Sequence, residues 1–229
     1  MPGPDVIHEC PICSKKVAVG SLLSGNTFGA KFYSDGKRIA PMLPEFPQIT
    51  KCPDCGNIFW LDENSEIKLS QEENIESARF LNVYEYLEAI ENKNYSSSTN
   101  ELFLRTRVWW GFNDRVRNGE DIFQKENDEA IYEENILRLI ELQEQEREML
   151  SSIKKSMGEE AINALKKIDG VEVDFQVLMS LTELYRNIGN FDTSKEILAI
   201  AAKDSGQTPL IKIFEQKTEE KNKLVFNLN

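Results

Sequence analysis

The sequence predicts an α+β protein, with a small β module at its N-terminal end and a mainly α-helical body after it. Two observations predict the β module: two cysteine pairs of the form C-x-x-C stand 38 residues apart, and short runs of strand-forming residues lie beside them. A third observation predicts the body, because apolar residues recur at helical spacing from about residue 64. We place the boundary after residue 63, which gives a β module of residues 1–63 and a helical domain of residues 64–229.

All four cysteines of the chain belong to these pairs, which are Cys10 with Cys13 and Cys52 with Cys55. A gap of two residues forms a tight turn that directs both sulfur atoms inward. Two such turns supply the four thiolates of a closed tetrahedral metal shell, which keeps no open position for catalysis. We therefore predict that these four residues hold one structural Zn²⁺ ion.

The residues around the cysteines favour such turns. Pro11 and Pro53 fix φ at the start of each turn and remove an N–H group that would need a partner. Gly56 provides the positive φ that the exit of such a turn often requires. Ser14 stands at the same place in the first turn and lacks that freedom, so the first turn is the weaker of the two signals.

Other interpretations of the cysteines stay open. Iron in a rubredoxin-like centre uses the same four ligands. Disulfides suit a secreted chain, but no apolar leader follows Met1, so we expect a reducing cytoplasm. A thioredoxin-type redox pair needs one C-x-x-C at a βα junction, which two pairs beginning with Cys-Pro fit poorly. We expect His8 at the surface, since four cysteines already fill the metal shell.

Composition and charge limit the classes of function. The chain has 229 residues and a net charge of −12, and residues 1–62 carry six basic and six acidic side chains. The whole net charge therefore lies in residues 63–229, and such a body repels nucleic acid and anionic membranes. No apolar run approaches the length of a membrane span. A single histidine leaves little material for acid–base catalysis, so we expect no enzyme.

Local signals predict individual elements. Asp35-Gly36 between two short β-capable runs predicts a hairpin, and residues 58–60 (Ile-Phe-Trp) predict a strand. Asn82 with Glu85 forms a capping box that starts a helix. Further helices are predicted over residues 100–117, ended by Asn118-Gly119, over residues 159–168, and from Thr208-Pro209 onward.

The predicted helix over residues 100–117 has apolar residues on two sides. One face carries Leu102, Val108, Trp109, Phe112 and Val116. Phe103 and Trp110 lie on the opposite side, near Arg107 and Arg117. The simplest interpretation is a helix between two neighbours. The alternative is a ligand groove formed by Phe103, Arg107, Trp110 and Arg117, which would bind an anionic or peptide ligand.

Residues 174–203 resemble one tetratricopeptide repeat. Apolar and small residues stand at the intervals of that repeat, and Gly189-Asn190 forms the turn between its two helices. The residues of the match are Leu178, Leu181, Tyr185, Gly189, Phe191, Leu198 and Ala201, with Ser194 in place of the usual alanine. The C-P-x-C-G form of the second cysteine pair resembles the turns of zinc ribbons and rubredoxins.

The chain as a whole resembles bacterial proteins in which an N-terminal zinc ribbon precedes a tetratricopeptide-like helical domain. The resemblance implies no reaction. We therefore expect a non-enzymatic, cytoplasmic zinc-binding protein whose helical domain binds a protein or peptide partner. The alternatives are a nucleic-acid-binding zinc-ribbon protein, which the negative charge of the helical body disfavours, and a thiol redox sensor.

Overall fold

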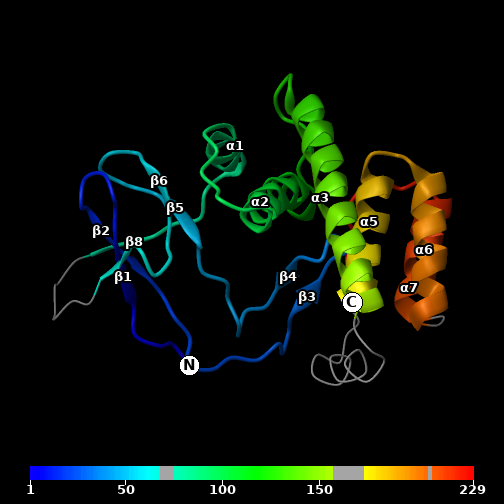
Figure 1. The fold of residues 1–229 in the computed structure, drawn as a ribbon, viewed down its shortest axis with the longest axis horizontal. Coiled ribbons are helices and arrows are strands. Elements are labelled where there is room, and N and C mark those ends of the chain that lie inside the picture. The colour runs from blue at the N-terminus through cyan, green and yellow to red at the C-terminus, as the bar shows by residue number, and fades with distance from the viewer. Residues whose placement is uncertain (68–74, 157–172, 206–207) are drawn as a thin grey trace. The chain divides into compact units, whose positions relative to one another are not determined.

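The computed structural model describes residues 1–67, 75–156, 173–205 and 208–229, with strands in the first third and helices after them (Figure 1). This order confirms the predicted α+β class. The strands are β1 (Val6–Glu9), β2 (Lys16–Val19), β3 (Lys31–Phe32), β4 (Arg38–Ile39), β5 (Ile49–Lys51), β6 (Ile58–Trp60), β7 (Glu66–Ile67) and β8 (Glu76–Ser77). The helices are α1 (Val83–Glu91), α2 (Ser98–Arg117), α3 (Asp128–Ser156), α5 (Val173–Asn187), α6 (Phe191–Ser205) and α7 (Pro209–Glu219). The predicted helix over residues 159–168 lies outside the described residues.

The chain forms two compact units. The first contains Met1–Lys31 and Arg38–Leu104, and the second contains Phe32–Lys37 and Arg105–Asn229. Helix α2 therefore begins in one unit and ends in the other. The predicted boundary after residue 63 means that the residues before it and after it fold separately. The division into compact units does not address separate folding, so the boundary stays a prediction.

The first unit is built on two β-hairpins that carry the cysteine pairs. Strands β1 and β2 pair antiparallel at the centre of a four-stranded sheet of order β7-β1-β2-β8. Strands β5 and β6 form a separate antiparallel pair, which confirms the strand predicted over residues 58–60. Val17 and Phe59 pack against Cys10 and Cys52 in the core of this unit. One apolar cluster of this unit is therefore formed around the cysteine pairs.

The hairpin predicted from Asp35-Gly36 is present as the pair β3–β4. Gly36 takes a φ of +77°, which a residue with a side chain adopts only at a cost. The tip, residues 32–37, belongs to the second unit, and Ser34 and Asp35 are buried there. Hairpin tips are normally exposed. This tip is instead buried in the second unit and forms part of the core of that unit.

The local helix signals are confirmed at three positions. Asn82 caps α1 and forms the predicted capping box with Glu85. Helix α2 ends before Gly119, whose φ is +77°. The Thr208 side chain caps α7, with Pro209 at its start. These ends are fixed by interactions within a few residues, which explains why sequence predicts them.

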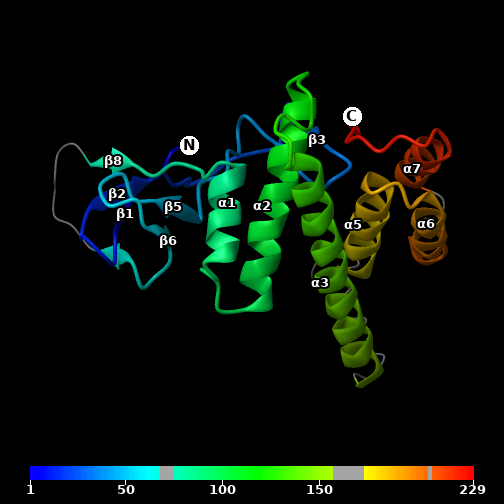
Figure 2. The same ribbon diagram turned by 90° about the horizontal axis from the view of Figure 1, so that it is seen from above.

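The helices of the second unit pack side by side. Helix α5 packs against both α3 and α6, and α7 packs against α6 (Figures 1 and 2). Gly189, with a φ of +81°, makes the short turn from α5 to α6, as predicted. The Ser194 hydroxyl donates a hydrogen bond of 2.9 Å to the carbonyl of Thr182 where these two helices meet. Over the described ranges, no helix is both long and apolar enough to cross a membrane.

Candidate metal centre

The first cysteine pair lies in the turn between β1 and β2. The Cys10 N–H donates to the Lys15 carbonyl at 2.9 Å, and the Ser14 N–H donates to the Cys10 carbonyl at 2.9 Å. Ser14 takes a φ of +60°. These two bonds fold residues 10–15 into one compact turn that contains Cys13.

The second pair repeats this geometry in the turn between β5 and β6. The Cys52 N–H donates to the Asn57 carbonyl at 2.7 Å, and the Gly56 N–H donates to the Cys52 carbonyl at 3.1 Å. Gly56 takes a φ of +74°, close to that of Ser14. The two turns therefore have the same conformation although only one contains glycine. The sequence signal was weaker at the first turn because Ser14 stands where the second turn has glycine. In the structure the first turn is nevertheless formed by the same hydrogen bonds as the second.

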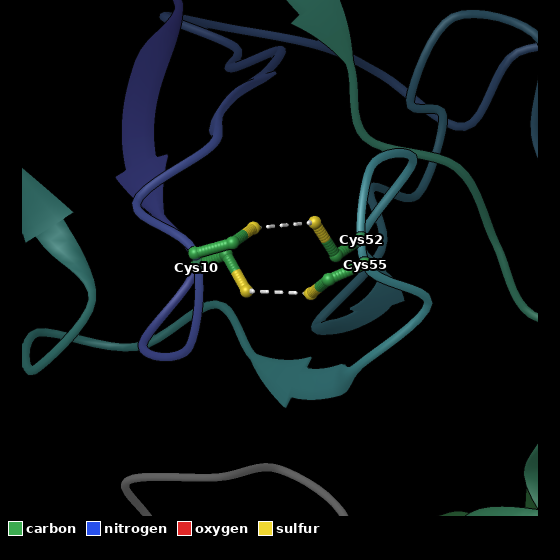
Figure 3. A group of neighbouring side chains, drawn as sticks. Cys10, Cys52 and Cys55 are labelled. Carbon is green, nitrogen blue, oxygen red and sulfur yellow. Dashed lines mark hydrogen bonds between the residues drawn. The ribbon is translucent and has the colours of Figure 1, made fainter.

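The four sulfur atoms meet between the two turns. They all lie within 4.8 Å of one another. The Sγ atoms of Cys10 and Cys55 are 3.6 Å apart, and those of Cys13 and Cys52 are 3.5 Å apart. Figure 3 shows the sulfurs of Cys10, Cys52 and Cys55 pointing toward one another from the two facing turns.

These distances suit a metal ion better than disulfides. All four cysteines are free, and their separations exceed a disulfide bond of about 2.0 Å. A tetrahedral centre with metal–sulfur bonds of about 2.3 Å places its sulfurs about 3.8 Å apart. The observed separations bracket that value, so the predicted ligand set is positioned to coordinate one metal ion.

The electrostatics of the cluster also favour a bound cation. Burial opposes ionisation of Cys52, but the backbone N–H groups of Cys55 and Asp54 outweigh it and lower the pKa of Cys52 to about 7. At Cys13 the Lys15 N–H acts to lower the pKa, but desolvation and the neighbouring sulfurs raise it to about 12. The neighbouring sulfurs thus oppose a second negative charge at Cys13. A bound cation supplies the positive charge that four thiolates need.

His8 is buried in β1, which corrects the expectation of a surface position. Its Nδ1 lies 3.0 Å from the hydroxyl oxygen of Ser65. Burial lowers the pKa of His8, and the nearby carboxylates of Glu66 and Asp62 oppose that effect. His8 is not part of the sulfur cluster, whose members are all cysteines. Its role in the structure is to pack within the sheet.

The four residues of the predicted ligand groove have contacts in the structure. The Phe103 ring lies 5.6 Å from the ring of Trp60. The Arg107 guanidinium lies 5.0 Å from the centre of the Trp110 ring, and Trp110 Nε1 donates to the Asp35 carbonyl at 3.0 Å. Arg117 is ion-paired with Asp35, and its side chain is only 3% exposed. These contacts test neither the groove nor a ligand, and the groove stays a prediction.

The side chain of Asn57 makes a contact in the site that no sequence pattern indicated. Its Nδ2 lies 3.9 Å from the sulfur of Cys10, across from its own turn. Side-chain donors of this kind stabilise thiolate ligands and tune a metal centre. The position of Asn57, two residues after Cys55, is the only sequence signal for this contact.

The structure thus brings Cys10, Cys13, Cys52 and Cys55 together in a cluster that can hold a metal ion in a structural role. Comparisons of the chain with protein-family models, with curated proteins and with solved structures gave no significant match.

Proposed function

We propose that the chain is a zinc-binding protein with a structural Cys₄ centre, and that its helical unit binds a protein partner without catalysing a reaction. The observation that carries the metal assignment is the meeting of four sulfurs within 4.8 Å at the turns of two hairpins. Two facing hairpin turns of this kind resemble a zinc ribbon. A shell of four thiolates leaves no position for substrate, which supports a structural role.

The two cysteine turns would gain stability from such an ion. The cluster at these turns consists of the cysteines with Val17 and Phe59, so few apolar side chains join the two turns directly. Structural zinc in small modules contributes more than about 10 kcal/mol to folding. The ion would join the two hairpins, which are far apart in the chain. We place the protein in the cytoplasm, where thiols stay reduced.

Metal analysis tests this assignment. Untagged protein purified without added metal should contain one zinc ion per chain by mass spectrometry. Cys52→Ser should lose the ion, whereas Ile12→Ala should keep it, because the Ile12 side chain lies in the same turn and is 72% exposed. Iron in place of zinc would show as strong thiolate-to-iron absorption in the visible range. Protein that is folded and metal-free, with or without disulfides, would contradict the proposal.

The interaction role rests on the helices. Helices α5 and α6 form a helical hairpin with the small, buried Ser194 at their contact, as in a tetratricopeptide repeat. Arrays of such hairpins present surfaces to protein segments. Zinc-loaded protein used as bait should retain a stoichiometric partner from a lysate of its own cells. Repeated failure with a folded bait would count against this role.

A thiol redox sensor is the second candidate, and the exposed position of Cys55 favours it. In that case two metal-bound thiolates would give two electrons to hydrogen peroxide, which would take up two protons from solvent and become two water molecules. The two sulfurs would join in a disulfide and the metal ion would leave. The sulfurs that lie closest belong to different turns, so the expected disulfides are Cys10–Cys55 and Cys13–Cys52. Mass spectrometry after mild peroxide treatment, with zinc release followed in parallel, distinguishes this role from a purely structural one.

A further inference from the structure

The last eight residues, 222–229, form a terminal segment that the second unit holds mainly by its backbone. Arg186 donates to the carbonyls of Asn222 and Leu224, the latter at 2.9 Å, and Asn187 donates to the carbonyl of Lys223 at 2.7 Å. Two buried side chains therefore bind three successive carbonyl groups. Such contacts recognise an extended chain and place little demand on its side chains.

The segment also pairs with the hairpin tip in the manner of an added strand. The Ser34 N–H donates to the Phe226 carbonyl at 3.0 Å, and the Phe226 N–H donates to the Ser34 hydroxyl at 3.1 Å. The Leu228 N–H donates to the Phe32 carbonyl at 2.8 Å. The hairpin tip thus offers one edge to the terminal segment, as a sheet edge does in β-augmentation.

Only part of the segment's side chains contribute. Val225 is buried, and the Phe226 ring packs 5.2 Å from the Phe214 ring and 4.9 Å from the Arg186 guanidinium. The side chains of Lys223, Leu224 and Asn227 are exposed. The surface therefore selects an extended chain with a branched apolar residue followed by an aromatic one.

The residues that hold the segment are fixed by contacts that do not involve it. Arg186 Nε donates to the Glu183 carboxylate at 2.9 Å, and that carboxylate also accepts the Ser34 hydroxyl at 2.8 Å. Asn187 Oδ1 accepts the Trp109 indole N–H at 2.8 Å. Burial raises the pKa of the Glu183 carboxyl, and the Arg186 guanidinium opposes that shift. A site whose donors are held in place beforehand binds at a lower entropic cost.

The segment begins where α7 ends. Lys221 takes a φ of +52°, and the N–H groups of Lys221 and Asn222 donate to the carbonyls of Thr218 and Lys217, both at 3.1 Å. These bonds close the end of α7 and do not involve the residues after Asn222, so the helix end can stay intact when the segment leaves.

We propose that this surface is a peptide-binding site that residues 222–229 occupy from within the chain, and that an extended segment of another protein, with the same apolar–aromatic pair, displaces them. This proposal rests on the interaction role proposed above and names its partner class. The terminal segment then acts as an internal competitor. The apparent association constant for a partner equals the intrinsic constant multiplied by the fraction of chains in which the site is open.

A labelled peptide with the sequence of residues 222–229 tests the proposal on the full, zinc-loaded chain. Fluorescence polarisation should show that full-length Phe226→Ala binds this peptide at least about tenfold more tightly than the wild-type chain, because the weakened internal segment leaves the site open more often. Leu224→Ala is the matched control, since Leu224 lies in the same segment and is 45% exposed, and its affinity should stay at the wild-type level. A peptide with alanine in place of the phenylalanine should not bind.

Hydrogen exchange on the wild-type chain gives a second readout that does not depend on the folding of a variant. The amides of Phe226 and Leu228 should exchange through an opening that leaves the amides of α5 protected. The proposal is overturned if the amides of Phe226 and Leu228 exchange only when the amides of α5 also exchange. It is also overturned if Phe226→Ala and the wild-type chain bind the peptide with equal affinity. A concentration-dependent dimer of the wild-type chain would also overturn it, since the occupant would then be a second copy. In each of these cases metal content and partner capture are unaffected, so failure here is distinct from failure of the proposed function.

Discussion

At the scale of single residues, two positions at the exits of the cysteine turns have equivalent backbones but different side chains. Ser14 and Gly56 both take positive φ values, +60° and +74°. The left-handed region costs a residue with a Cβ atom about 1–2 kcal/mol, whereas glycine enters it freely. The first turn therefore holds strain that the second avoids, and the contacts around the sulfurs offset it.

Substitution at these positions has opposite expected effects. Gly56→Ala should lower the unfolding free energy of the metal-bound protein by about 1–2 kcal/mol. A Cβ atom there would meet only the Cε of Lys51, at 3.8 Å, so the loss comes from the backbone and not from a clash. Ser14→Gly should raise the unfolding free energy by up to about 1 kcal/mol. Denaturant titration measures both, and equal stability of all three proteins would show that neither turn is strained.

At the scale of elements, the hairpin β3–β4 shows what local sequence predicts and what it does not. Asp35-Gly36 predicts the turn because the conformational preference of these residues is local. The burial of Asp35 depends on Arg117, which is 82 residues away in the chain, and on Asn113, whose Nδ2 donates to it at 2.9 Å. An aspartate in a turn is normally exposed, so no local signal reports this contact.

Breaking this ion pair should destabilise the helical unit. Asp35→Asn removes the charge opposite Arg117, and both side chains are almost completely buried. Arg117 keeps a second ion pair with Asp114, whose side chain is 36% exposed. The expected loss is therefore about 1–3 kcal/mol, which is less than the cost of a buried charge left with no partner. Arg138→Ala is the control, because it removes an ion pair with Glu141 in which both side chains are exposed. Such an exposed ion pair contributes less than about 1 kcal/mol to the free energy of unfolding. Thermal unfolding followed by helical circular dichroism compares them, and similar losses would contradict the assignment.

The start of helix α1 gives a second prediction at this scale. The Asn82 side chain accepts from the N–H groups of Tyr84 and Glu85, and the Glu85 carboxylate accepts from the Asn82 N–H at 3.0 Å. Asn82→Ala should therefore lower the unfolding free energy by about 1 kcal/mol. Asn82→Ser keeps an acceptor at the cap and should retain most of the stability. If urea titration finds the alanine and serine variants equal, the cap contributes nothing.

At the scale of the whole molecule, sequence predicted the elements better than their assembly. The helix caps, the α5–α6 turn and the turn of each cysteine pair follow from patterns within a few residues. The meeting of the two cysteine pairs spans 39 to 45 residues, and it could be predicted because a closed metal shell needs four ligands. The grouping of residues 32–37 with the helices rests on contacts such as Ser34 with Glu183, 149 residues apart. The hold of Arg186 on the terminal segment is also non-local, at 36 to 38 residues. Non-local contacts of this kind leave no periodic trace in a sequence.

Removal of the proposed metal ion tests whether the helical unit stays folded without it. A strong chelator should unfold the hairpins β1–β2 and β5–β6, since their core includes the metal ligands themselves. Most of the helical circular dichroism at 222 nm should survive, because the packing of α3, α5, α6 and α7 lies within the second unit. Asp35→Asn serves as the reverse control: it should weaken the helical unit and leave zinc affinity unchanged. A single transition that removes strands and helices together would show one cooperative structure.

The path of the chain between the two cysteine pairs limits how this protein can be divided. The segment that leads from Cys13 to Cys52 leaves its unit after Lys31 and returns at Arg38. A fragment that begins at residue 64 would lack Ser34 and Asp35, and so would deprive Arg117 of a buried counter-charge. Because the two units alternate along the chain, no single cut of the backbone separates one complete unit from the other.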